Sequence, residues 1–143
     1  MRAPSKLHLE NFLPYRLSVL SNTVSSAIAA AYFAHFGLSI PEWRVIAVLA
    51  ANPGLSAAEV TARTAMDKVA VSRAVATLLG AGRLRRTMAK ADRRRTHLEL
   101  TSAGARVYAQ VVPMALNYER HLIAPLSARD RATLDRIDRK SVV

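Results

Sequence analysis

Seven of the thirteen residues from Arg83 to Arg95 are lysine or arginine, and the only acidic residue among them is Asp92. A solvated surface normally mixes charges of both signs to limit self-repulsion, so a run of one sign favours an external polyanion such as a nucleic acid. We expect Asp92 to be structural, because it can pair with Arg94 across a turn and leave Arg93 or Arg95 to project. The basic residues of this run that we expect to contact DNA are Arg86, Lys90, Arg93, Arg94 and Arg95.

A single arginine surrounded by small side chains lies just before this basic run. Residues 67 to about 79 predict a helix in which Asp67 caps the first turn and the glycines at 80 and 82 end it. At 100° per residue, one face is apolar and the opposite face carries Arg73 among small residues. Such a face can enter a major groove and present a bidentate donor to base edges, although alanine-rich helices with one exposed arginine are also common in other proteins. The residues of this helix that we expect to contact DNA are Lys68, Val69, Ala70, Ser72, Arg73 and Thr77.

The basic run itself has the pattern of a β-hairpin. Residues 84–88 and 96–100 predict two strands that frame a turn at 89–92. Alternation along the second strand directs its two leucines inward and its His97 and Glu99 outward. The helix and the hairpin together favour contact with a duplex more strongly than either does alone.

Two short helices are expected to support the arginine-bearing helix. Ser39 with Glu42, and Ser56 with Glu59, have the spacing of a capping box, in which serine and glutamate satisfy each other's backbone N–H groups. The predicted helices begin at these serines and end near positions 50 and 64. A tight corner at residues 65–66 then joins the second of them to the arginine-bearing helix and makes a helix-turn-helix.

Longer apolar stretches precede and follow this unit. The spacing of apolar residues predicts a helix over 14–35, another from 101 or 102 to about 121 with a bend at Pro113, and a last one over about 127–140. A small domain has little left to cover the apolar residues near the start of the first helix. Their number therefore suggests a partner chain.

The composition fits one ordinary domain that binds a polyanion. The chain has 143 residues, 51% of them hydrophobic, and a net charge of +11. Residues 61–95 hold ten lysine or arginine residues and two aspartates, so this quarter of the chain contributes +8. Charge concentrated in one segment is typical of a nucleic-acid footprint.

The sequence offers little that could support catalysis, a cofactor or a metal. The four histidines are scattered without ligand spacing, and a phosphate-binding glycine loop, a Gly-x-Ser-x-Gly motif and cysteine are absent. We therefore expect neither an enzyme nor a cofactor, and no disulfide or thiol switch. We also expect a cytoplasmic protein without a membrane segment, because we find no apolar run near the roughly 18 to 20 residues needed and no signal-peptide core.

The chain resembles the MarR family of winged helix-turn-helix transcription regulators. The matching stretches are residues 38–50 (LSIPEWRVIAVLA), 54–75 (GLSAAEVTARTAMDKVAVSRAV), 92–101 (DRRRTHLELT) and 103–108 (AGARVY). The most specific part is the Asp-x-Arg of the wing at Asp92 and Arg94. The resemblance implies a mainly α (α+β) fold in a single domain of residues 1–143, with the winged helix-turn-helix at about 38–101 and dimerisation helices at about 9–36 and 102–140. It also implies a homodimer and, in many members, control by a small molecule.

In many members of the family, the small molecule binds where the first helix meets the winged unit. Candidate residues near that junction are polar or aromatic, and each could equally be a packing residue, Trp43 above all. The candidates are Tyr15, Arg16, Asn22, Ser25, Tyr32, His35, Trp43 and Arg44. Because Arg16 and Arg44 could bind a carboxylate or phosphate, we expect an anionic aromatic acid or its coenzyme A thioester. This choice draws on the similarity of residues 13–24 and 38–45 to regulators of aromatic-acid breakdown.

Two functions remain open at this point. A sequence-specific regulator would be a homodimeric repressor of a near-palindromic operator with half-sites about one helical turn apart, released by its effector. The alternative is a sequence-independent nucleic-acid-binding protein without a small-molecule effector, whose affinity collapses with salt and shows no preference among duplexes. The small residues around Arg73 favour the first, because charge attraction alone would not require them.

Overall fold

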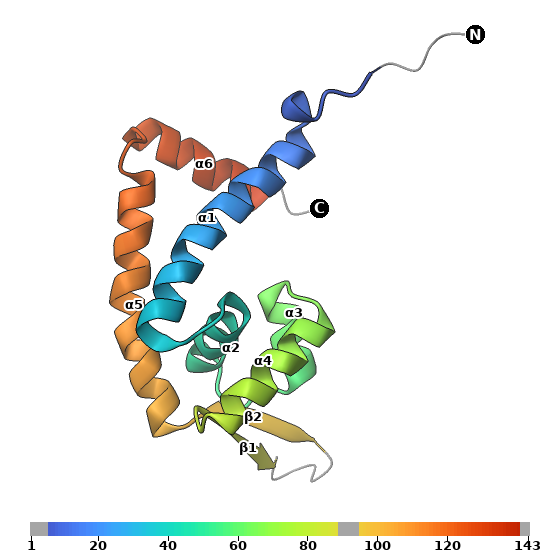
Figure 1. Cartoon of the computed structure of the whole chain (residues 1–143), viewed down its shortest axis with the longest axis vertical. Helices are drawn as coiled ribbons and strands as arrows, with labels where there is room; N and C mark the ends of the chain where they lie inside the picture. The colour runs from blue at the N-terminus through green and yellow to red at the C-terminus, as the bar shows by residue number, and fades with distance from the viewer. Residues whose placement is uncertain (1–5, 89–94, 141–143) are drawn as a thin grey trace, which may run out of the picture. The chain divides into compact units, whose positions relative to one another are not determined.

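The computed structural model describes residues 6–88 and 95–140, which form helices and one small sheet (Figure 1). In chain order the elements are η1 (Leu9–Asn11, a 3-10 helix), α1 (Leu13–Phe36), α2 (Ile40–Ala51), α3 (Ala57–Thr64), α4 (Lys68–Gly80), β1 (Leu84–Met88), β2 (Thr96–Leu100), α5 (Ser102–Ile123) and α6 (Ala128–Lys140). This content confirms the expected mainly α (α+β) winged helix-turn-helix. The chain divides into two compact units, Met1–Tyr108 and Ala109–Val143, with the boundary inside α5.

The helices of the helix-turn-helix begin where the sequence predicts. The Ser39 hydroxyl accepts the N–H of Glu42, while the carboxylate of Glu42 accepts the N–H of Ser39. Ser56 and Glu59 form the same reciprocal pair at the start of α3. Asp67 caps α4 by accepting a backbone N–H of the first turn at 2.9 Å. Local hydrogen-bonding chemistry therefore decides where α2, α3 and α4 start.

The core of the first unit lies between α2, α3 and α4. The most deeply buried residues of these helices are Val45, Ile46, Leu49, Val60, Val71 and Leu78, each at most 1% exposed. Leu84 of β1 and Leu98 of β2, 3% and 2% exposed, extend this core to the hairpin. Burial of a full aliphatic side chain is worth about 1.5 to 3 kcal/mol, so this interior holds the helix-turn-helix and the hairpin together as one unit.

The hairpin is bound to the loop between α2 and α3. β1 and β2 are antiparallel, with Leu84 opposite Leu100. The N–H of Leu98 donates to the carbonyl of Leu55 at 2.8 Å, and the N–H of Gly54 donates to the carbonyl of Leu98 at 3.0 Å. The loop thus adds one bridge to the strand edge that β1 leaves free.

The same loop corrects the expected exposure of His97 in β2. The Nδ1 of His97 donates to the carbonyl of Gly54, and its Nε2 is buried without a hydrogen-bond partner among the described residues. Glu99 is half-buried and forms an ion pair with Arg85 at 2.9 Å. The prediction that His97 points outward into solvent was therefore wrong, because the loop between α2 and α3 covers that side of the strand.

Most of α1 is exposed. Of its residues, all within the described part of the chain, Tyr32 alone is buried. Leu13 is 59% exposed, Leu20 60% and Phe33 70%. Apolar surface of this extent marks an interaction site in a folded protein.

By length and composition alone, α1 could also cross a membrane. The expectation that no segment approaches that size was wrong. Between Leu17 and Ala34 the chain carries no charged residue, but serine, threonine and asparagine interrupt it. A search for an unbroken apolar run therefore misses a stretch whose average hydropathy is high. Core helices of water-soluble proteins pass the same test.

The corner between α3 and α4 stores a small amount of backbone strain. Ala65 has φ +51° and ψ +34°, the left-handed region that glycine adopts without cost. Ala65→Gly should raise the free energy of unfolding by about 0.5 to 1 kcal/mol, measured by urea unfolding with the fluorescence of the single Trp43. The control Ala62→Gly, at an exposed position inside α3, should lower it by about 1 kcal/mol. Destabilisation by both variants would contradict the prediction.

Candidate nucleic-acid interface

The outer face of α4 carries one long cation among small residues. Its inner face is buried, with Val71 and Leu78 each 1% exposed. Arg73 is exposed on the opposite face together with Ala76. Of the residues of α4 predicted to contact DNA, Lys68, Val69, Ser72, Arg73 and Thr77 are exposed and Ala70 is half-buried. The Thr77 hydroxyl donates to the Arg73 carbonyl at 3.0 Å, which leaves its methyl group as the more available contact.

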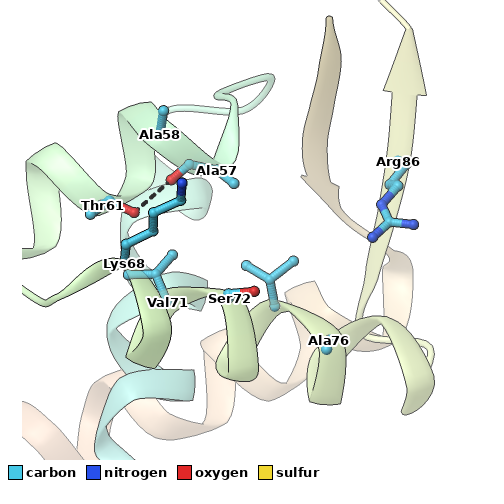
Figure 2. Close-up of a pocket in the computed structure, with 9 residues that line it drawn as sticks. Ala57, Ala58, Thr61, Lys68, Val71, Ser72, Ala76 and Arg86 are labelled. Carbon is cyan, nitrogen blue, oxygen red and sulfur yellow. Dashed lines mark hydrogen bonds between the residues drawn. The ribbon is translucent and has the colours of Figure 1, made fainter.

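A cleft of about 440 Å³ lies beside this face, between α3, α4 and β1. Figure 2 shows Lys68 extended along one side towards Ala57, Arg86 on β1 at the other side, and Ser72 on α4 between them. The remaining lining is small or apolar: Ala57, Ala58, Thr61, Val71, Val75 and Ala76. Lys68 and Arg86 thus flank a concave surface that is otherwise nearly neutral. Each of the two cations can bind one phosphate of a duplex backbone.

The wing contributes further exposed cations. Arg86 and Arg95 are exposed, whereas Arg85 is partly neutralised by its ion pair with Glu99. Four residues named from the sequence lie outside the described residues: Lys90, Asp92, Arg93 and Arg94. The pair between Asp92 and Arg94 therefore stays a prediction. Arg83, the first cation of the run, is half-buried and donates to the carbonyl of Phe36, a contact that the sequence pattern gave no reason to expect.

A carboxylate, that of Glu59, lies near the start of β2. The backbone N–H and then the hydroxyl of Ser56 lower the pKa of Glu59, and His97 and Arg95 lower it further by their charge. Because the folded chain depresses this pKa, the resulting stabilisation of α3 is present above the ordinary carboxyl pKa and is lost as the pH falls through the folded value. A cleft lined by Glu59, Arg95 and His97 lies at this position.

The structure brings together two of the residues predicted to bind an effector. The rings of Tyr32 and Trp43 are 5.7 Å apart, and Trp43 stacks on Tyr108 at 5.8 Å with an interplanar angle of 20°. Trp43 is thus the centre of an aromatic cluster, as a core anchor should be. The sequence offered no signal for Tyr108, which comes from α5 and meets Trp43 only through the tertiary fold.

The other predicted effector residues are spread over α1 and α2. Tyr15 and Arg16 border an open groove along α1 that also includes the carboxylate of Glu10. An acidic group in that groove disfavours an anionic ligand there. The remaining candidates are His35, whose ring lies 6.1 Å from that of Phe36, exposed Asn22 and Arg44, and half-buried Ser25.

This geometry, an exposed arginine on a helix whose other face packs in a helix-turn-helix next to a cationic hairpin, has counterparts among known proteins. The family model of the MarR family matches residues 36–95, which include α2 to α4 and β1. A mutant MarR from Escherichia coli, solved in complex with operator DNA, has a TM-score of 0.84 at 21% identity and covers 97% of this chain and 100% of its own. Over residues 36–95 the chain is therefore similar to the MarR family, and it shares the fold of the DNA-bound MarR over nearly its whole length.

Two further MarR-type regulators show similarity over most of the chain. The transcriptional regulator HosA of Escherichia coli is 25% identical over 103 residues, 72% of this chain and 76% of that protein. The PcaV transcriptional regulator of Streptomyces coelicolor, solved with its natural ligand, has a TM-score of 0.77 at 24% identity, covering 98% of this chain and 96% of its own. Both relatives are transcriptional regulators.

Proposed function

We propose that the protein is a homodimeric, sequence-specific repressor, in which the outer face of α4 reads base edges and the hairpin contacts the adjacent backbone. The observation that carries this proposal is the solvent-exposed Arg73 among small residues, beside a cleft with Lys68 and Arg86 at its sides. An arginine on such a face can reach two acceptors of a guanine while the helix backbone lies deep in the groove. The two cations supply phosphate contacts that fix the register.

A second copy of the chain is the proposed partner of the exposed apolar surface. Each unit exposes apolar residues of its own: Leu13, Leu20 and Phe33 in the first, and Leu116, Leu122, Leu134 and Ile137, 46% to 52% exposed, in the second. Exposed polar residues on α1, among them Ser18 and Asn22, favour a protein partner over lipid. We therefore propose one cytoplasmic regulatory domain that forms a two-fold dimer, with two α4 helices positioned for a near-palindromic site.

We further propose an anionic aromatic acid, or its coenzyme A thioester, as effector. The cluster of Tyr32, Trp43 and Tyr108 supplies aromatic surface in the first unit, and Arg44, next to Trp43 in the chain, supplies an exposed cation. PcaV, a protein of the same fold, is known with a natural ligand, which supports control by a small molecule in this chain also. A ligand need only favour a dimer whose two α4 helices are wrongly spaced.

Selection of bound duplexes from a random pool tests the central proposal. The full chain should enrich a near-palindrome, and this duplex should bind roughly a thousandfold or more tightly than a scrambled duplex of equal length. Equal affinity for both duplexes would instead support the sequence-independent alternative. Sedimentation of the free protein and of the complex then shows whether two chains bind each site.

Arg86→Gln should weaken all duplexes to a similar degree. Because we assign this side chain a phosphate contact, its loss should reduce the slope of log affinity against log salt concentration by about 0.9 per chain. The measurement is a salt titration of both the selected and the scrambled duplex. Arg129→Gln, an exposed arginine of α6, is the matched control and should leave the slope unchanged. A loss of affinity confined to the selected duplex would assign Arg86 to base reading.

The effector proposal is tested by adding a panel of phenolic acids and their thioesters to the complex with the selected duplex. A true effector should lower the affinity for DNA about 5- to 150-fold, and DNA must lower the affinity for the effector by the same factor. If no compound of the panel releases DNA, the proposed effector class is wrong, while the assignment of DNA binding is unaffected.

A further inference from the structure

Arg83 is the first cation of the basic run, but its side chain is bound to the end of α1. Its Nη2 donates to the carbonyl oxygen of Phe36 at 3.0 Å, and the residue is half-buried. Phe36 is the last residue of α1 and lies 47 positions earlier in the chain. The contact therefore joins two elements that the sequence places far apart.

The end of α1 leaves its last carbonyl available for such a partner. Gly37 has φ +62°, and its N–H donates to the carbonyl of Phe33 at 2.9 Å, while the N–H of Leu38 donates to that of Tyr32 at 3.4 Å. These two bonds satisfy carbonyls one turn back from the helix end. The carbonyl of Phe36 receives the guanidinium instead, and a cation at a helix C-terminus is favoured by the helix dipole.

The backbone of Arg83 is hydrogen-bonded at the same time to α4 and to the residue that precedes α5. Its N–H donates to the carbonyl of Leu78 in α4 at 2.9 Å, and its carbonyl accepts the N–H of Thr101, just before α5, at 3.1 Å. The Thr101 hydroxyl also donates to the carbonyl of Gly82 at 2.6 Å. One residue thus connects the end of α1, the end of α4, the start of β1 and the start of α5.

We propose that Arg83 is a positioning residue that fixes α1 to the junction of α4 and the hairpin, and that it makes no phosphate contact. This inference rests on the proposed function, because the direction of α4 relative to α1 matters once two chains must bind one duplex. Loss of the guanidinium should loosen that junction and weaken duplex binding without removing a DNA contact. Its neighbour Arg86, exposed on β1, should behave in the opposite way.

The test compares Arg83→Gln with Arg86→Gln in the full chain. Affinity for the selected and the scrambled duplex is measured over a range of salt concentrations. Arg83→Gln should bind the selected duplex about fivefold or more weakly, with the salt slope of the wild type, whereas Arg86→Gln should lower the slope by about 0.9 per chain. An equal fall of the slope in both variants would show that Arg83 binds phosphate and would overturn the proposal.

Amide hydrogen exchange without DNA provides a second and independent measurement. In Arg83→Gln the N–H groups of Gly37 and Leu38 should exchange about fivefold faster, because the last turn of α1 loses a stabilising bond. Unchanged exchange would overturn the proposal even if no duplex is preferred, so the failure of the proposed function and the failure of this inference are distinguishable. Arg83→Met, which keeps the apolar stem, replaces the glutamine variant if that does not fold. If neither Arg83→Gln nor Arg83→Met folds, the result would support a structural role for the contact between Arg83 and Phe36, since a residue that only binds phosphate is not required for folding.

Discussion

Arg73→Ala should remove most of the discrimination between the selected duplex and a scrambled one. A bidentate arginine contact to guanine is worth about 1 to 3 kcal/mol of discrimination, so the preference should fall about 5- to 150-fold per half-site. The fold should be unaffected, because the side chain is exposed and the packed face of α4 is unchanged. The measurement is competition binding of both duplexes at one salt concentration.

The matched control for Arg73 is Arg106→Ala, which removes an exposed arginine from α5 in the same unit. It should leave the ratio of the two affinities unchanged. If Arg73→Ala weakens both duplexes by the same factor, the arginine contacts phosphate and base reading must come from another residue. An unchanged footprint and an unchanged preference would show that the outer face of α4 does not meet the bases.

Gly104→Ala should have the largest effect on the fold. A Cβ at this position would lie 2.1 Å from the carbonyl oxygen of Arg83, well inside van der Waals contact. That oxygen accepts the N–H of Thr101 and belongs to the backbone, so it cannot rotate away as a side chain could. The first turn of α5 must shift, which should cost about 3 kcal/mol or more in the free energy of unfolding. Thermal unfolding should then occur about 10 °C lower.

Gly80→Ala is the matched control for Gly104. No atom lies within 4 Å of the Cβ that this substitution would add, and the position is the last residue of α4. It should raise the stability by about 0.5 kcal/mol, because alanine restricts the unfolded chain more than glycine does. If Gly104→Ala melts at the temperature of the wild type, the first turn of α5 does not lie this close to the carbonyl of Arg83.

The parts of this site that depend on local chemistry were predictable from the sequence. The capping serines and Asp67 act on neighbours within three residues, so their spacing alone indicates where helices begin. The exposure of Arg73 follows from the helical period once the apolar face is known. The strands of the hairpin were also predicted, because turn residues and alternation are local signals.

The parts that depend on distant segments were not predictable. Strand alternation correctly separates His97 from the buried Leu98, but it cannot show that a loop from 43 positions earlier covers the histidine. In the same way, the sequence does not distinguish Arg83 from the other cations of the basic run, because its partner Phe36 lies 47 positions earlier in the chain. Tyr108 has the spacing of an ordinary apolar helix residue, and its stacking on Trp43 requires α5 to pass α2.

The bridge between the α2–α3 loop and β2 has a consequence for how copies of this chain can associate. Both backbone hydrogen-bonding groups of Leu98, the central residue of β2, are already used by Gly54 and Leu55. An incoming strand would find no donor or acceptor at the middle of that edge, so edge-to-edge strand addition, the usual route from a small sheet to aggregates, is blocked there. The proposed dimer is therefore not expected to form through this edge of β2, and the exposed apolar residues of the helices are the surface proposed for it.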